Sequence, residues 1–151
     1  MDSMKIQTKY HGEVVIQQED LLTFPKGIPA FEEEKEFTIL PLQEGTPFSI
    51  LQSTKTSNLA FVIGDVFLLF PTYEIELPQN AIDELQLQEA RDAIVYCMMT
   101  IHEDFYHSTA NLQAPLIINS AKKIGKQVVL NHPTYKTKHG INNSPAFSVE
   151  D

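Results

Sequence analysis

Residues 24–31 of the 151-residue chain read Phe24-Pro25-Lys26-Gly27-Ile28-Pro29-Ala30-Phe31, with two prolines and one glycine between two phenylalanines. Each proline fixes its φ and lacks a backbone donor, and glycine accepts a positive φ. The segment is therefore predicted to be a shaped loop rather than the interior of a strand or a helix. Its apolar side chains exceed what a simple connection needs, so we expect them either to pack onto a core or to contact a partner.

The residues before this loop alternate between apolar and polar side chains. Residues 4–10 place Met4 and Ile6 on one face, and residues 14–16 continue the alternation after Gly12. A period of two residues is typical of half-buried strands. Two strands joined at Gly12 are predicted.

Three further strand candidates follow the loop at a regular spacing of about ten residues, which is typical of an antiparallel meander. They span residues 37–42, 48–53 and 59–63, with turn-forming residues between them. The acidic run between the loop and the first of them, residues 32–36, is predicted to be a solvent-exposed turn rather than a metal site.

The middle of the chain is predicted to hold two more strands. Residues 66–70 form an unbroken apolar run that ends at Pro71 and suits a strand covered on both faces. Residues 73–77 alternate, which places apolar side chains toward the core and Glu74 and Glu76 toward water.

One segment of the chain has the pattern of a short helix. It is predicted to begin at Pro78 or Asn80 and to bury Ile82 and Leu85, which lie three residues apart.

The later part of the chain returns to strand patterns. Residues 93–101 are β-branched enough to predict a central strand, with a buried helix as the alternative. The last strands are predicted at residues 111–119 and 127–131, with Gly125 providing the turn between them. We therefore expect a mainly β, single-domain antiparallel β-barrel-like or sandwich fold with one short helix.

Domain limits follow from the same patterns. The β domain is predicted to span residues 1–139, and residues 140–151 have the composition of a flexible C-terminal tail. Phe147 and Val149 are its only sizeable apolar side chains, so docking onto the chain's own body or onto another copy is the alternative for the tail. Neither a signal peptide nor an 18-residue apolar run is present, and Cys97 is the only cysteine. These features favour a cytoplasmic protein that does not enter a membrane.

Charge is distributed unevenly along the chain. Residues 1–110 hold 18 acidic and 6 basic residues, whereas residues 111–149 hold five lysines and no acid. The formal net charge is -9. An acidic surface repels phosphate backbones and attracts basic proteins, so direct binding of nucleic acid is not expected. The five lysines are expected to form a solvated face.

The common catalytic motifs are missing from the sequence. It contains no G-x-S-x-G, P-loop, G-x-G-x-x-G, H-E-x-x-H or C-x-x-C pattern, so neither catalysis nor a cofactor is predicted. The best candidate for a metal site is residues 102–107, but His102 and His107 are five apart and share no face of a helix or strand. A polar loop is the preferred interpretation there. Cys97 lies in an apolar run, where burial should raise its pKa and make the thiol unreactive.

Several blocks of sequence, in the same order, resemble the family of the flagellar assembly factor FliW over roughly residues 4–141. The blocks are Met4-Lys-Ile-Gln-Thr-Lys-Tyr-His-Gly12, Phe24-Pro-Lys-Gly-Ile-Pro-Ala-Phe-Glu32, Leu51-Gln-Ser53, Phe67-Leu-Leu-Phe-Pro-Thr-Tyr-Glu74, Asn111-Leu-Gln-Ala-Pro-Leu-Ile-Ile-Asn119 and Gly125-Lys-Gln127. Ala30 stands where the family pattern usually has glycine, which predicts that this position needs no positive φ here.

The resemblance implies a small, β-rich, barrel-like cytoplasmic protein without catalysis. It also implies two protein partners, flagellin and the RNA-binding translational regulator CsrA, which exchange on the factor and so couple the flagellin level to its translation. An acidic surface would attract a basic RNA-binding protein and oppose the approach of phosphate, which agrees with this expectation.

Two apolar patches are the predicted partner-binding sites. The first comprises Phe24, Ile28, Pro29 and Phe31, and the second comprises Phe70, Pro71 and Tyr73. An amphipathic helix of flagellin is the expected occupant. The alternative for these residues is that they only close the barrel. The alternative for the whole protein is a small-ligand carrier with a cavity inside the barrel.

Overall fold

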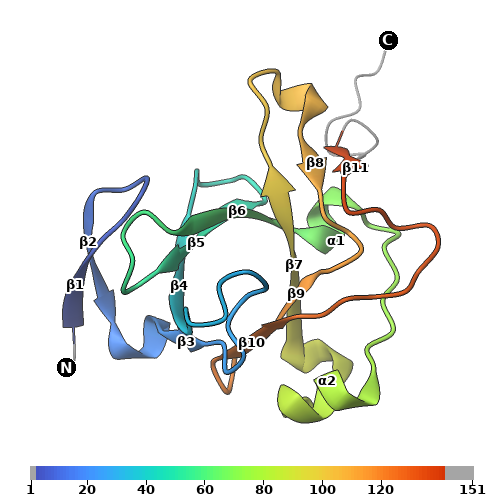
Figure 1. Ribbon diagram of the computed structural model, residues 1–151, viewed down its shortest axis with the longest axis horizontal. Coiled ribbons are helices and arrows are strands. Elements are labelled where there is room, and N and C mark those ends of the chain that lie inside the picture. Colours follow the sequence, from blue (N-terminus) through green and yellow to red (C-terminus); the bar gives the residue numbers. More distant parts are fainter. Residues whose placement is uncertain (1–2, 142–151) are drawn as a thin grey trace.

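The computed structural model describes residues 3–141, and its main feature is a ring of seven strands (Figure 1). The strands are β3 (Leu22–Thr23), β4 (Glu36–Pro41), β5 (Phe48–Ser53), β6 (Ala60–Asp65), β7 (Ala93–Thr100), β9 (Leu116–Asn119) and β10 (Ile124–Gln127). The ring closes because β9 pairs with both β7 and β10, and β10 also pairs with β3. All of these pairings are antiparallel except β3 with β10. The predicted mainly β, barrel-like single domain is confirmed.

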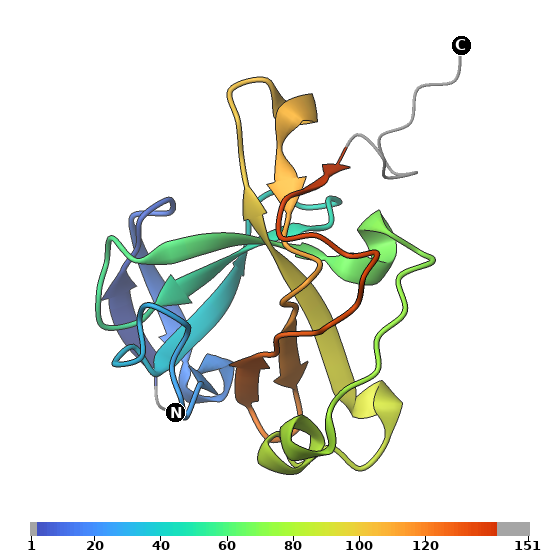
Figure 2. The same cartoon turned by 45° about the vertical axis from the view of Figure 1, so that its right-hand side comes forward.

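Smaller elements surround the ring. The hairpin of β1 (Ser3–Gln7) and β2 (Glu13–Gln17) forms a separate sheet, and β8 (Thr109–Ala110) and β11 (His139–Gly140) extend from the end of β7. The short helices are α1 (Val66–Leu69), α2 (Gln79–Glu84) and the 3-10 turns η1 (Gln18–Asp20), η2 (Ala90–Asp92) and η3 (Phe105–His107). Figures 1 and 2 show the hairpin and the two α-helices on opposite sides of the barrel.

The core is divided by the barrel wall, because successive side chains of a strand point to opposite faces. On β7, Tyr96 and Met98 pack with the cluster inside the barrel, whereas Val95 and Cys97 pack with a second cluster outside it. The inner cluster consists of Leu22, Phe24, Ile28, Phe37, Leu51, Ile63, Leu116 and Ile118. The outer cluster is covered by α1, α2 and the chain between residues 128 and 135.

The middle of the chain differs from its predicted strands. Residues 66–69 form the helical turn α1, because the side chain of Asp65 accepts hydrogen bonds from the backbone of Phe67 and Leu68 and starts a helix. Residues 73–77 keep the predicted alternation of burial but pair with no strand. The predicted helix is present as α2 with Pro78 at its N-cap. The described part of the chain therefore holds two short α-helices where one was predicted.

The last strands lie earlier or are shorter than predicted. The turn between β9 and β10 is made by residues 120–123, and Lys123 has a φ of 60° there. The side chain of Asn119 accepts hydrogen bonds from the backbone of Ala121 and Lys122, which replaces the turn predicted at Gly125. Gly125 instead lies in β10, where an added Cβ would approach the ring of Phe24 to 2.5 Å. Close packing, not a turn, requires glycine at this position.

The predicted tail begins inside the fold. Gly140 pairs with Thr109, and Ile141 is fully buried. The remaining part of the predicted tail, with Phe147 and Val149, lies outside the described residues. Within residues 3–141, no helix has the length and apolar character needed to cross a bilayer.

Candidate functional site

The loop of residues 24–31 connects β3 to β4 and enters the opening of the ring (Figure 1). Its first turn is closed by a hydrogen bond of 2.8 Å from the Gly27 N–H to the Phe24 carbonyl. Gly27 has a φ of 66°, and an added Cβ would lie 2.5 Å from the Glu32 carbonyl oxygen. Glycine is therefore required at this position for two reasons, the dihedral angle and the lack of space.

The second turn of the loop, at residues 28–31, overturns the prediction for Ala30. Its φ is 74°, in the left-handed region that disfavours residues with a Cβ. The Phe31 N–H donates to the Ile28 carbonyl at 2.6 Å across this turn, with Pro29 before the left-handed residue as in a type II turn. The turn imposes the dihedral angle, and the Ala30 N–H donates to the Glu32 carboxylate at 2.8 Å.

The four predicted anchors of this loop separate into two pairs. Phe24 and Ile28 are 0% and 2% exposed inside the barrel, and the Phe24 and Phe37 rings meet edge to face at 5.3 Å. The prediction that Phe24 and Ile28 offer a surface is wrong, because a side chain that fills the barrel cannot reach a partner. Pro29 is exposed, and Phe31 is 41% exposed with its ring 5.7 Å from that of Phe61. Only this second pair lies on the surface.

The second predicted patch is also mostly buried. The Tyr73 hydroxyl donates to the Leu112 carbonyl at 2.8 Å, and burial raises the pKa of this tyrosine. The ring of Phe70 meets that of His139 at 5.3 Å, so residues from the end of the described chain cover this patch. Pro71 is exposed. Phe70 and Tyr73 are therefore corrected to core residues.

Two neighbouring exposed apolar residues on α1 are among those that escaped the sequence analysis. Phe67 is 45% exposed and Leu68 is 61% exposed, because α1 turns them away from the outer core while it buries Val66 and Leu69. The signal for this was Asp65, a favoured N-cap residue directly before the apolar run.

Phe67 lines an apolar groove of about 320 Å³ outside the barrel. The groove is lined by Phe67, Ile75, Leu77, Ile82, Leu87, Gln88, Glu89, Ala93 and Val95. These residues belong to α1, the extended segment before α2, α2 with the residues that follow it, and the start of β7. Glu74 and Glu76 line a separate hollow together with Val129 and Leu130. Residues 74–77 thus form a ridge with one apolar and one acidic side.

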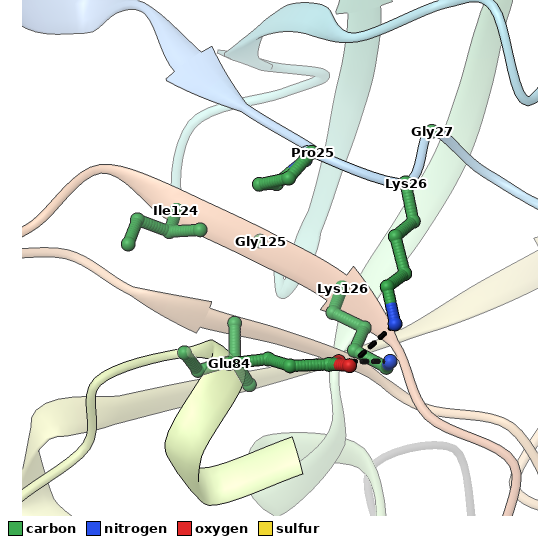
Figure 3. A pocket seen from close by; sticks show the side chains of 8 residues that line it. Pro25, Lys26, Gly27, Glu84, Ile124, Gly125 and Lys126 are labelled. Atoms are coloured by element: carbon green, nitrogen blue, oxygen red, sulfur yellow. Dashed lines mark hydrogen bonds and ion pairs between the residues drawn. The ribbon is translucent and has the colours of Figure 1, made fainter. Parts of the chain in front are cut away.

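A second hollow lies beside the loop of residues 24–31 (Figure 3). There Glu84 of α2 accepts hydrogen bonds from both Lys26 of the loop and Lys126 of β10. The ammonium groups of Lys126 and Lys26 hold the pKa of the Glu84 carboxyl below its usual range. The three side chains join α2, the loop and the barrel wall. These three side chains line the hollow together with Pro25, Gly27, Leu85, Ile124 and Gly125.

The other candidate residues show no assembled chemical site in the described part of the chain. His107 Nδ1 lies 3.3 Å from a carboxylate oxygen of Asp104, and both side chains are exposed. No group of three or more histidine, cysteine or acidic side chains among residues 3–141 is arranged to hold a metal ion. Cys97 is fully buried, and burial raises its pKa to about 12, as the sequence predicted.

Comparison with known proteins decides the family. The sequence model of the family described as FliW protein matches residues 5–141. The chain belongs to the FliW family. A flagellar assembly factor FliW of Geobacillus kaustophilus (strain HTA426) is 51% identical over 138 residues, which cover 91% of this chain and 95% of the relative. That of Bacillus subtilis (strain 168) is 45% identical over 138 residues, covering 91% of this chain and 96% of the relative.

A solved structure supports the same assignment. The crystal structure of a flagellar assembly factor FliW superimposes with a TM-score of 0.86 and 48% sequence identity, over 91% of this chain and 96% of that one. The FliW match ends at Ile141, which is also the last described residue. It includes both predicted patches, the groove and the three side chains around Glu84.

Proposed function

We propose that the chain is a cytoplasmic flagellar assembly factor that binds flagellin and, in exchange, the translational regulator CsrA, without catalysing a reaction. The observation that carries this proposal is membership of the FliW family over residues 5–141. Relatives that are about half identical to the chain are named flagellar assembly factors. The exchange of partners is the function that the family resemblance implied.

The charge of the chain supports binding to a basic regulator. Twenty acidic residues against 11 basic ones give the formal net charge of -9. A charge of this sign accelerates the approach of a basic RNA-binding protein and opposes the approach of RNA to the same place. Attraction between exposed charges weakens as salt rises, because the Debye length shortens.

The exposed members of the predicted patches are the proposed apolar contacts. Pro29 and Phe31 extend from the first patch, and Pro71 extends from the second. The buried members, Phe24, Ile28, Phe70 and Tyr73, are proposed to act only by holding these three residues in place. The inner cluster fills the barrel with apolar side chains, so the structure offers no support for the alternative of a small-ligand carrier.

Titration calorimetry with purified flagellin and purified CsrA tests this function. We expect saturable binding of each protein, competition between them, and an affinity for CsrA that falls as sodium chloride rises from 50 to about 300 mM, by the screening argument above. Binding of neither protein would refute the proposal. Affinity for CsrA that does not change with salt would remove electrostatic attraction from it.

A pair of aromatic truncations tests the loop contact. We expect Phe31→Ala to weaken flagellin binding, since a contact aromatic removed from an interface costs about 1–2 kcal/mol or more, which is about tenfold in affinity. Tyr10→Ala, at a tyrosine that is 50% exposed near the tip of the β1–β2 hairpin, is the matched control and should leave affinity unchanged. Equal affinities of the two variants would exclude the loop as a contact.

A further inference from the structure

The groove on the outer face of the barrel has the shape and chemistry of a docking site. We propose that it binds an amphipathic helix of a partner protein, one that carries lysine or arginine beside its apolar face. This inference rests on the proposed function as a protein-binding factor, and it names the surface and the chemistry of the bound segment.

The lining of the groove fits aliphatic side chains. Seven of its nine lining residues are apolar, and its volume of about 320 Å³ is at the lower end of the range for ligand pockets. Ala93 and Val95 of β7 line the groove, and Figures 1 and 2 show α1 and α2 at different levels along this strand. A helix presents apolar side chains at i, i+3 and i+4 in such a row. Phe67 on α1 is the one aromatic residue among the described residues of the lining.

The charge near the groove determines which charged side chains the bound helix should carry beside its apolar face. Residues 66–95, the stretch that contains every residue lining the groove, hold six acidic residues and one basic residue, Arg91, and of these only Glu89 lines the groove. Arg91 is paired with Glu89 at 2.5 Å, and the Glu84 carboxylate is bound by the two lysines. The other acidic residues are Glu74, Glu76, Asp83 and Asp92. Glu74 and Glu76 line the separate hollow on the other side of the ridge of residues 74–77, and Asp92 accepts hydrogen bonds from the backbone of Gln88 and Glu89. The net negative charge of the whole stretch attracts a basic flank and repels an acidic one.

The same charges argue against a second copy of this chain as the occupant. Two copies that meet at the groove would each bring the net negative charge of residues 66–95 close to the contact, and like charges brought together destabilise an interface. A partner of opposite charge meets no such repulsion.

The wall formed by α2 is held in position before a partner binds. Its Glu84 is fixed by Lys26 and Lys126 (Figure 3), and the buried side chain of Asn119 donates to the carbonyls of Leu85 and Gln86 at the C-terminal end of α2, at 2.9 and 3.2 Å. These contacts attach a short helix to the loop and to the barrel. A groove that is already formed loses less conformational entropy on binding.

Binding of synthetic helices, followed by fluorescence anisotropy, tests the proposal. The probes are three 18-residue peptides: one with leucine on one face and lysine on the other, one with glutamate in place of lysine, and one with serine in place of leucine. We expect the leucine–lysine peptide to bind at least tenfold more tightly than the other two, because only it matches both the apolar lining and the net negative charge of residues 66–95.

Two charge-matched variants assign the binding to the groove. Phe67→Asp should weaken binding of the leucine–lysine peptide tenfold or more, although its added carboxylate would strengthen a purely electrostatic attraction. Leu68→Asp places the same charge on the neighbouring residue, which is more exposed and does not line the groove, and it should leave affinity within about twofold. Equal effects of the two variants would overturn the proposal. So would a dimer, seen by analytical ultracentrifugation, that Phe67→Asp dissociates.

The same variants separate this inference from the proposed function. If flagellin and CsrA both bind Phe67→Asp as they bind the unmodified chain, the groove is not the docking site, and the proposed function stands. If the unmodified chain binds the peptide through the groove but binds neither flagellin nor CsrA, the proposed function fails, and the groove as a site for basic amphipathic helices stands.

Discussion

Two apolar segments of similar composition, residues 24–31 and residues 65–71, place their side chains on opposite sides of the barrel wall. The first buries Phe24 and Ile28 within the ring, whereas the second leaves Phe67 and Leu68 exposed on the outside. Hydrophobicity alone therefore does not determine which apolar side chains of a segment are exposed. The local backbone geometry makes that choice.

The backbone of each segment explains its direction. In the first, positive φ angles at Gly27 and Ala30 reverse the chain twice, so that the loop folds into the opening of the ring. In the second, Asp65 caps a helical turn, and successive residues of a helix are about 100° apart, so four consecutive apolar residues cannot all face the core. The capped turn buries its first and last residues and exposes the two between them.

The largest expected effect contrasts the two phenylalanines. We expect Phe24→Ala to lower the free energy of unfolding by about 3–5 kcal/mol, because it leaves a cavity in the inner cluster. Phe67→Ala should lower it by less than about 1 kcal/mol, because its ring is already half in water. Urea denaturation followed by circular dichroism measures both. Similar losses would show that the two segments do not differ in packing as described.

Much of the fold could be predicted from the sequence, because strand alternation and turn residues are local signals. The hairpin, β4 to β7 and α2 follow directly from them. The strand predicted at residues 73–77 shows what such local signals cannot predict. Its alternation reports burial correctly, but a ladder needs a neighbouring strand, and that is a property of the complete fold.

The candidate site was less predictable than the fold. Phe24 and Gly125 are a hundred residues apart in the sequence. They meet only because the barrel closes, which places the aromatic side chain of Phe24 against the backbone of Gly125. Tyr73 is buried because Tyr135 packs on it at 4.4 Å, a contact that no local pattern contains. The exposed pair on α1 was missed for a different reason, since the local signal, Asp65 at the start of the helical turn, was present in the sequence but the apolar run after it predicts a strand.

An intermediate effect is expected from the left-handed turn of the loop. Ala30→Gly should raise the free energy of unfolding by about 0.5–1 kcal/mol, because the relief of the left-handed strain exceeds the added entropy of the unfolded chain. Ala121→Gly is the control, since Ala121 is exposed and is not among the described residues with a positive φ. The control should be neutral or slightly destabilising. Destabilisation by Ala30→Gly would contradict the strained turn.

The smallest effect concerns residues 65–71, the outer segment, where the ring of His139 packs on that of Phe70 and covers it. Burial, together with the charge of Lys136, lowers the pKa of His139 from its ordinary value of about 6.5. The unfolded chain then binds more protons than the folded chain between these two pKa values, so stability is full above about pH 7 and falls as the pH drops through 6.5.

His139→Asn removes this titration and tests its sign. Urea midpoints at pH 7.5, 6.5 and 5.5 should decline for the unmodified chain and decline less for the variant, since asparagine takes up no proton. This range lies above the ordinary carboxyl pKa of about 4.3, so the ion pairs of Glu84, whose folded pKa is lower still, stay intact throughout it. Parallel declines would mean that His139 titrates alike in the folded and unfolded chain. The contact of His139 with Phe70 would then be open to water, and this end of the outer segment would be less covered than described.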